Sequence, residues 1–302
     1  MFNRILVPTD FSRPSDAALA HARSLAGNTG STVHLLHVVD NAFLATTLGD
    51  PRDYELAAYE KLQRRLSVES PGAIPVVERC EAPAETITRY ARAHDIDLIV
   101  MGTQSRGRVA HQLRGSMARK IARTAPCPVL TMRETRRPPG ARAPRRMLVP
   151  TDFSPCSDAA LESAKLMAAR MGGSICLLHV IEHVAIDLQF GSELVPPQSL
   201  ESQQDLAAMA RIELGSRMLA DSRSRLSTTG DIVIGATAGM IAAYAADHAF
   251  DMIVMGTHGR SGIARLLMGS VAESVIRTAP CPVLTVKSRD AARARPVTVE
   301  AA

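Results

Sequence analysis

An internal repeat constrains this chain more than any other feature of its sequence. The segment from Arg4 to Ser12 (RILVPTDFS) returns 142 residues later, from Arg146 to Ser154, as RMLVPTDFS. A second segment, RTAPCPVLT at 123–131, returns unchanged 154 residues later at 277–285. The second copy is therefore 12 residues longer, and the extra residues fall between its expected second and fourth strands. A single repeat of this length indicates two whole domains rather than a solenoid of short units.

A chain of 302 residues suits two domains of about 150 residues each. We place the domains at 1–133 and 146–290, joined by a linker at 134–145. The linker region holds six arginines between residues 133 and 146, together with prolines. Basic runs also occur in nucleic-acid-binding arms, but this one is short and lacks aromatic residues, which favours a solvated linker and no nucleic-acid partner. Residues 291–302 are small or polar and predict a disordered tail.

Within each copy, short apolar runs alternate with stretches typical of helices. In the first copy we expect strands near 4–8, 32–38, 74–78, 97–101 and 128–132. We expect helices near 15–26, 53–69, 84–94 and 115–124. Apolar runs without polar alternation suit parallel strands covered on both faces. The pattern predicts an α/β fold of two tandem doubly wound domains, each with a five-stranded parallel sheet and helices on both faces.

Prolines bracket the last strand of each copy, in the sequence PCPVL. Proline donates no hydrogen bond to a sheet, so these strands belong at a sheet edge or begin at the proline. Two equivalent edges offer a route to pairing between the copies. We therefore expect an intramolecular pseudo-dimer.

A glycine-rich segment follows the fourth strand of the second copy. It runs from Gly256 to Ser270 as GTHGRSGIARLLMGS, between the apolar run 251–255 and a helix-like segment at 271–277. Glycines let a ligand approach the backbone, and the start of a helix favours a phosphate. Ser270, with Glu273 three residues on, has the pattern of a capping box. We interpret the segment as a phosphate cradle. The alternative is that a strand-to-helix turn needs glycines anyway and that Ser270 only caps.

Asp152 ends the first strand of the second copy. In open α/β sheets, ligands bind at the carboxyl ends of strands where the strand order reverses. If strands 1 and 4 are neighbours, Asp152 and Gly256 face one pocket, and the carboxylate accepts hydrogen bonds from ribose hydroxyls. The alternative is an Asx-turn or a helix cap before the next helix, a common use of aspartate.

Together these segments resemble the ATP-binding universal stress proteins, in a tandem two-domain arrangement. The resemblance rests on Gly256-x-x-Gly259, then nine residues, then Gly269-Ser270, with VPTDFS after the first strand and PCPVL at the last. It implies flavodoxin-like or Rossmann-like domains with strand order 3-2-1-4-5. It also implies ATP, with or without Mg²⁺, as the ligand of the second domain. The residues that it places around this nucleotide are Pro150, Thr151, Asp152, Val180, Gly256, Gly259, Arg260, Gly269, Ser270 and Val271.

The first copy departs from this motif. Ser105 stands where the second copy has Gly259, and Arg119 stands where it has Glu273, so the capping-box pattern is lost. A β-carbon at position 105 crowds a phosphate or changes the backbone angle. We expect this domain to bind nucleotide weakly, differently or not at all. Its degenerate site comprises Thr9, Asp10, Val38, Gly102, Arg106, Gly115 and Ser116.

Several classes of protein are disfavoured by the sequence. Five cysteines without a C-x-x-C pair argue against a disulfide framework or a zinc site, and indicate reduced thiols in the cytoplasm. His37 and His179 recur at matching positions, but no further ligands complete a metal site, so we expect core or pocket-lining histidines. No apolar run is long enough to span a membrane, and the first residues leave no room for a signal peptide.

Three functions remain open. The favoured one is a cytoplasmic, ATP-binding regulatory protein of the stress response, with a homodimer and an unidentified protein partner expected. The second is a slow ATP hydrolase or phosphotransferase. Phosphoryl transfer needs metal ligands and a residue that positions the nucleophile, and the loop carries neither a carboxylate pair nor a P-loop lysine, so we assign no catalytic residue. The third is a nucleotide-free scaffold that dimerises through its edge strands.

Overall fold

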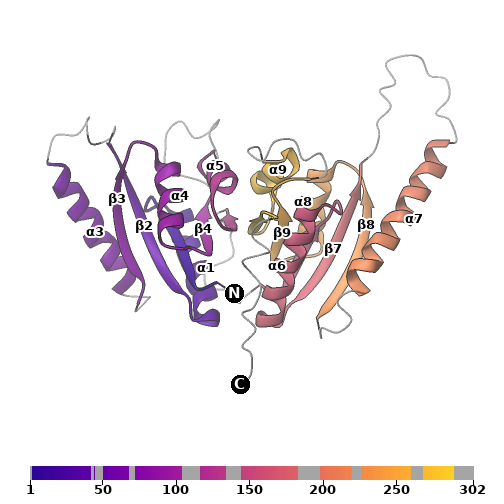
Figure 1. The fold of residues 1–302 in the computed structure, drawn as a ribbon, viewed down its shortest axis with the longest axis horizontal. Coiled ribbons are helices and arrows are strands. Elements are labelled where there is room, and N and C mark those ends of the chain that lie inside the picture. Colours follow the sequence, from indigo (N-terminus) through magenta and orange to yellow (C-terminus); the bar gives the residue numbers. More distant parts are fainter. Residues whose placement is uncertain are drawn as a thin grey trace, which may run out of the picture.

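The structure is a computed structural model that describes residues 2–41, 44, 50–67, 72–103, 116–133, 144–182, 198–219, 226–259 and 268–288. The elements of the first half are β1 (Arg4–Thr9), α1 (Arg13–Thr29), β2 (Thr32–Asp40), α3 (Pro51–Ser67), β3 (Ile74–Cys80), α4 (Pro83–Ala93), β4 (Leu98–Gly102), α5 (Ser116–Thr124) and β5 (Val129–Met132). Those of the second half are β6 (Arg146–Pro150), α6 (Pro155–Met171), β7 (Ser174–Ile181), α7 (Gln198–Leu219), β8 (Ser227–Ile234), α8 (Thr237–Asp247), β9 (Met252–Gly256), α9 (Ser270–Thr278) and β10 (Val283–Val286). Strands alternate with helices in both halves, as predicted (Figure 1).

The strands form one ten-stranded sheet in the order β3-β2-β1-β4-β5-β10-β9-β6-β7-β8. Within each half the order is 3-2-1-4-5 and neighbouring strands are parallel, which confirms the doubly wound prediction. The strand order reverses beside β1 in the first half and beside β6 in the second. Ligand pockets in open α/β sheets lie at such a reversal.

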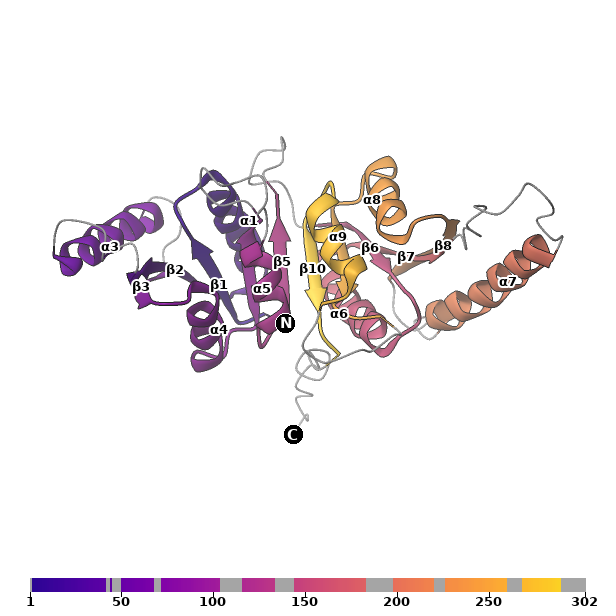
Figure 2. The same cartoon turned by 90° about the horizontal axis from the view of Figure 1, so that it is seen from above.

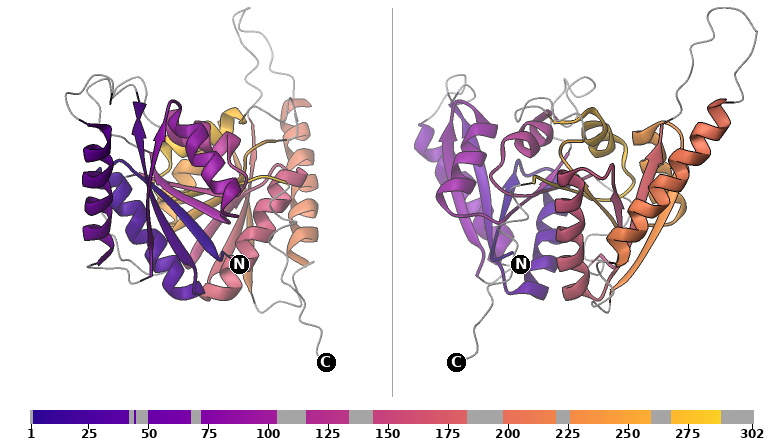
Figure 3. Two further views of the ribbon diagram at one scale, coloured as in Figure 1. Left: turned by 60° about the vertical axis from the view of Figure 1, so that its left-hand side comes forward. Right: turned by 45° about the vertical axis from the view of Figure 1, so that its right-hand side comes forward.

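Helices cover both faces of this sheet. Ile5 and Val7 of β1 belong to the same buried cluster as α1 and α3, whereas Leu6 between them belongs to the cluster with α4 and α5. Successive strand residues point to opposite faces, and because helices cover both faces, Ile5, Leu6 and Val7 are all fully buried. Burial of a leucine or isoleucine side chain contributes about 1.5–3 kcal/mol. Figure 3 shows α3 and α7 at the two outer ends of the molecule.

The two halves meet where β5 and β10 pair in antiparallel fashion, which confirms the expected pairing of the proline-bracketed strands. Leu130 is the register partner of Leu284. The Oγ1 atom of Thr131 donates to the carbonyl of Val283 at 3.2 Å, and Thr285 donates to the carbonyl of Val129 at 3.1 Å. Figure 2 shows these two strands side by side at the centre of the molecule. The seam therefore has pseudo-twofold symmetry, and the outer edges of the sheet are β3 and β8.

Two cations strengthen this seam in a symmetric way. Arg133 donates to the carbonyl of Arg277 at 2.9 Å, and Lys287 donates to the carbonyl of Arg123 at 2.9 Å. Each carbonyl lies in the last turn of the other half's final helix, α9 or α5. A cation near the carboxyl end of a helix is favourable because the helix dipole is negative there. Each half thus stabilises the other's helix end.

The linker predicted at 134–145 lies outside the described residues except for its last two positions, and the predicted tail at 291–302 lies wholly outside them. In the described ranges, none of the helices combines the length and apolar character needed to cross a membrane.

Candidate functional site

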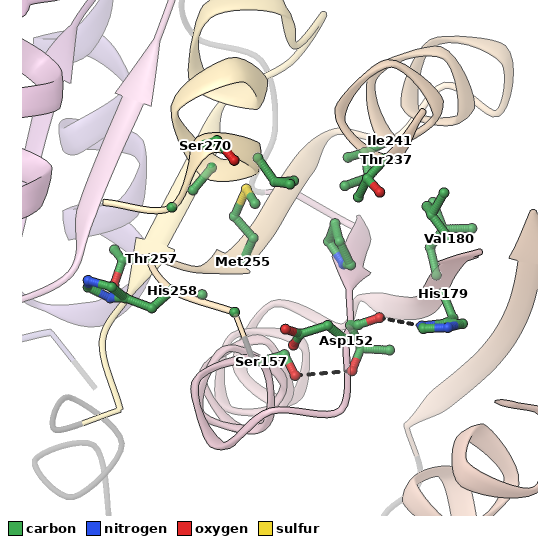
Figure 4. Close-up of a pocket in the computed structure, with 18 of the residues that line it drawn as sticks. Asp152, Ser157, His179, Val180, Thr237, Ile241, Met255, Thr257, His258 and Ser270 are labelled. Carbon is green, nitrogen blue, oxygen red and sulfur yellow. Dashed lines mark hydrogen bonds between the residues drawn. The ribbon is translucent and has the colours of Figure 1, made fainter. Parts of the chain in front are cut away.

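A cavity of about 480 Å³ lies at the carboxyl ends of β6, β7 and β9, between the first turns of α8 and α9. Figure 4 shows Asp152, Met255 and Ser270 around it. Nine of the ten residues predicted for the second domain line this cavity, namely Pro150, Thr151, Asp152, Val180, Gly256, Gly259, Gly269, Ser270 and Val271. The tenth, Arg260, lies outside the described residues.

The turn between β6 and α6 brings Asp152 into the cavity. Thr151 Oγ1 accepts a hydrogen bond from the Phe153 N–H at 3.0 Å and lies 3.1 Å from Ser157 Oγ. Phe153 has a φ of 64°, a left-handed conformation that is unusual for an aromatic residue. Ser154 then caps α6 by accepting from the N–H of Ser157 at 3.3 Å. This chain reversal presents the Asp152 carboxylate at the end of the strand.

The two oxygens of Asp152 have different surroundings. Oδ1 accepts from the Ser154 N–H at 3.1 Å, so the Asx-turn considered from the sequence is present. Oδ2 faces the glycine loop, because a β-carbon added to Gly259 would lie 2.8 Å from it. Asp152 therefore forms the Asx-turn through Oδ1 and keeps Oδ2 facing the glycine loop and the cavity.

The described glycines of the loop have different surroundings. A β-carbon at Gly256 would lie 3.0 Å from the backbone carbonyl carbon, the carbonyl oxygen and the Sγ atom of Cys156 in α6. The absence of a β-carbon at Gly256 therefore lets α6 pack closely, and Gly256 also lines the cavity. Gly102 has the same role in the first half, where a β-carbon would lie 2.7 Å from the β-carbon of Pro14. Among the loop glycines that the structure describes, only Gly259 has its missing β-carbon beside a carboxylate that lines the cavity.

The capping box predicted at the start of α9 is not present. Gly269 occupies the N-cap position, no side chain caps the helix, and Ser270 is the first helical residue. The Gly269 carbonyl accepts from the Glu273 N–H at 3.0 Å. The carboxylate of Glu273 instead pairs with Arg119 of the first half. The residues that line the cavity here are Gly269, Ser270, Val271 and Ala272, from the helix start whose dipole favours an anion.

The opposite side of the cavity has an apolar wall with polar groups at its rim. Val180 and Ile241 contribute to the wall. His179 has its Nδ1 atom 2.8 Å from the carbonyl oxygen of Thr151, so Nδ1 carries the proton and donates it. Its ring stacks on Phe153 with centroids 4.5 Å apart. His179 therefore lines the pocket, as the sequence indicated, and in the described ranges no three His, Cys, Asp or Glu side chains gather as metal ligands.

Three residues that line the cavity, Glu182, Thr237 and His258, were not predicted from the sequence. Thr237 opens α8 and donates from Oγ1 to Glu182 Oε1 at 2.6 Å, and both residues line the cavity. Glu182 follows β7 and Thr237 follows β8, so both lie at carboxyl ends of strands, where a search of every strand end finds them. His258 also lines the cavity, with Nδ1 2.8 Å from Thr257 Oγ1.

The first half has an equivalent cavity of about 260 Å³. Five of the residues predicted for its degenerate site line it, namely Thr9, Asp10, Val38, Gly102 and Ser116. Arg106 and Gly115 lie outside the described residues. Pro83 replaces Thr237, and Met117 replaces Val271. The two pockets are therefore lined by residues at equivalent positions, and the first pocket has the smaller volume.

Local contacts in the first pocket repeat those of the second. Thr9 Oγ1 lies 3.0 Å from Ser15 Oγ, and His37 donates from Nδ1 to the carbonyl of Thr9 at 2.8 Å. Burial lowers the pKa of His37, and the hydrogen bond to Thr9 opposes that shift. Asp10 Oδ1 accepts from both the N–H and the hydroxyl of Ser12. The turn after the first strand and the histidine of the second strand therefore have matching contacts in both halves.

Fold and pockets together define a class of protein, a tandem doubly wound α/β protein with a pocket at the strand-order reversal of each half. The chain belongs to the universal stress protein family, whose sequence profile matches residues 1–133 and 144–287. A universal stress protein of Mycobacterium tuberculosis is 25% identical over 296 residues, which cover 94% of this chain and 96% of that protein. One from Methanocaldococcus jannaschii is 30% identical over 157 residues, covering 48% of this chain and 96% of its own.

Solved structures agree with the fold. The crystal structure of a universal stress protein from Archaeoglobus fulgidus matches with a TM-score of 0.65 at 22% identity, over 94% of this chain and 96% of that one. At this identity the likeness concerns the fold. The tandem arrangement predicted from the repeat is therefore confirmed.

Proposed function

We propose that this chain is a nucleotide-dependent regulatory module of the stress response, which binds ATP, with or without Mg²⁺, in the second-domain pocket. The observation that carries the proposal is the contact between Asp152 and the glycine loop. Because Gly259 has no β-carbon, the loop backbone passes directly beside Asp152 Oδ2. This places a carboxylate for ribose hydroxyls within one cavity with a helix start for phosphates.

Different parts of the pocket suit the base, the ribose and the phosphates of a nucleotide. The apolar wall with Val180 and Ile241 suits a base, and Asp152 suits ribose. The start of α9, with Gly269 and Ser270, suits phosphates, because the first N–H groups of a helix have no partner within that helix. When bound, ATP supplies phosphate oxygens that ligate Mg²⁺ together with water. The chain's own contribution is to hold and orient the nucleotide.

Nucleotide titrations of purified chain test this proposal. We expect Gly259→Ser to weaken ATP binding at least about tenfold, because its β-carbon would meet Asp152, and tenfold corresponds to about 1.4 kcal/mol. Asp152→Ala removes the ribose partner and should weaken binding similarly. The matched control is Gly215→Ser, since a β-carbon at Gly215 meets nothing within 4 Å. Absence of ATP affinity in the unmodified chain would overturn the proposal.

For the first domain we propose weaker or altered nucleotide binding. Its nucleoside side is kept, but Ser105 replaces the glycine on which the second pocket depends. Nucleotide released by heating the purified protein should amount to about one ATP per chain if one site of this tandem is filled. Two per chain would show that Ser105 does not impair the first pocket.

Other sequence predictions stay predictions, namely the cytoplasmic location, the homodimer and an unidentified protein partner. The scaffold alternative has the duplicated edge strands build a dimerisation platform for another protein. In the structure, β5 and β10 pair with each other inside one chain. That pairing leaves neither edge for another protein.

A further inference from the structure

Arg119 and Glu273 occupy equivalent positions in the two halves, 154 residues apart. Each is the fourth residue of its helix, α5 or α9. Across the pseudo-twofold seam, Arg119 Nη1 contacts Glu273 Oε1. The side chains are 31% and 44% exposed, so the pair is only partly shielded from solvent. Two positions that a perfect repeat would fill with the same residue therefore carry opposite charges.

Glu273 lies close to where a phosphate would bind. The three residues before it, Ser270, Val271 and Ala272, all line the second pocket. Three residues of helix span about 4.5 Å, and helical side chains lean toward the helix start. A carboxylate in the first turn is favourable with the helix dipole. The same carboxylate repels a bound polyphosphate, because like charges at this range repel each other.

We infer that Arg119 of the first domain is a specificity-determining residue for the phosphate-binding end of the second-domain pocket, acting through Glu273. This inference rests on the proposed function of that pocket. By pairing with Glu273, Arg119 neutralises the one acidic side chain in the first turn of α9. The second pocket then presents its helix start to phosphates without an opposing charge.

The same pair has the opposite effect on the first pocket. Arg119 lies in the first turn of α5, whose residues Ser116, Met117 and Ala118 line that pocket. A guanidinium there would attract an anion, but it is bound to Glu273 across the seam. The ion pair thus favours polyphosphate in the second pocket and removes an attraction for it from the first.

Calorimetric titration of the full chain with ATP and with adenosine tests the inference. Adenosine reports the nucleoside side of the pocket alone. We expect Arg119→Ala to weaken ATP binding about fivefold at low salt, with less effect at high salt because surface charges are screened, and to leave adenosine binding unchanged. Arg119→Lys should retain ATP affinity. The double variant Arg119→Ala/Glu273→Gln should recover it, since no uncompensated carboxylate remains.

Arg123→Ala is the matched control, since it removes an exposed arginine from the last turn of the same helix. Equal losses of ATP and adenosine affinity in Arg119→Ala would reveal a merely structural role and overturn the inference. So would ATP binding that does not change. If the unmodified chain binds adenosine but not ATP, the phosphate end fails as a site, and if it binds neither, the proposed function itself fails.

Discussion

Leu130 and Leu284 face each other across the antiparallel seam, at the same position of their repeats. Both are about 1% exposed, and each belongs to a buried cluster that draws residues from both halves. The register of this pairing places one residue opposite its own equivalent. That residue is a leucine here, and the hydrophobic core runs through the seam without interruption.

The seam should contribute to global stability. We expect Leu284→Ala to lower the free energy of unfolding by about 2–5 kcal/mol, the cost of a cavity in a packed core. The control Leu219→Ala removes a leucine that is 72% exposed on α7 and should have little effect. Urea denaturation followed by circular dichroism measures both. A loss no larger than that of the control would contradict a core that is continuous through the seam.

Gly256 and Gly259 should respond differently to the same substitution. Gly256→Ala places a β-carbon 3.0 Å from the backbone of Cys156 and should lower the melting temperature. Gly259→Ala meets a side-chain carboxylate instead, so we expect stability to change by less than about 1 kcal/mol while ATP affinity falls. Thermal melts and ATP titrations of the two variants give the comparison. Equal loss of stability in both would show that the whole loop is structural.

His21 should make stability depend on pH. Its Nε2 atom is buried without a hydrogen-bond partner among the described residues, and burial lowers its pKa from 6.5 to about 4. Between these values the unfolded chain binds more protons than the native state, so stability is full above pH 6.5 and falls as the pH drops toward 4. The loss attributable to His21 is at most about 3 kcal/mol.

Burial also lowers the pKa of His34 and His37, so these residues add to the loss in the same direction. Denaturation between pH 7 and 4 of the chain and of His21→Leu isolates the contribution of His21. We expect a flatter profile in the variant. An unchanged slope would show that His21 keeps an ordinary pKa in the folded chain.

Arg217 should support the turn that carries Asp152. It donates from Nε to Asp158 at 2.8 Å, and its guanidinium carbon lies 4.9 Å from the centre of the Phe153 ring. The hydrogen bond from Arg217 to Asp158 raises the pKa of Arg217, so its guanidinium stays charged. Arg217→Ala should cost about 1–2 kcal/mol, within the range for charge-assisted and cation–π contacts. Arg211→Ala, an exposed arginine of α7, is the control in a thermal melt.

The sequence predicted most of the fold because its signals are local. Apolar runs of strand length, separated by helical stretches, indicated the five strands of the first copy and the helices between them. The Asx-turn of Asp152 was one of the two roles considered from the sequence, because aspartate before a helix commonly forms one. Asp152 and Gly256 could be brought together from the sequence because parallel strands end at one edge of a sheet. Nine pocket residues of the second domain were found on that ground and by resemblance.

The errors concern contacts between segments that are distant in the sequence. The spacing of Ser270 and Glu273 matches a capping box, yet Glu273 pairs with Arg119, which no local pattern indicates. The close packing of Gly256 on Cys156, which is 100 residues away, is likewise indicated by no local pattern. Thr237 was missed because it carries no motif, and only its position after β8 places it on the cavity.

The sequence by itself determined that one α/β unit occurs twice, because periodicity, capping and turn signals act within a few residues of one another. The tertiary structure alone decided the register in which the units pair, which atoms lie against each glycine and which charge contacts Glu273. These outcomes depend on side-chain packing and on pairs such as Leu130 and Leu284, which meet only after the sheet has formed. The repeat made the two halves alike, and the seam placed their differing residues, Arg119 and Glu273, in contact.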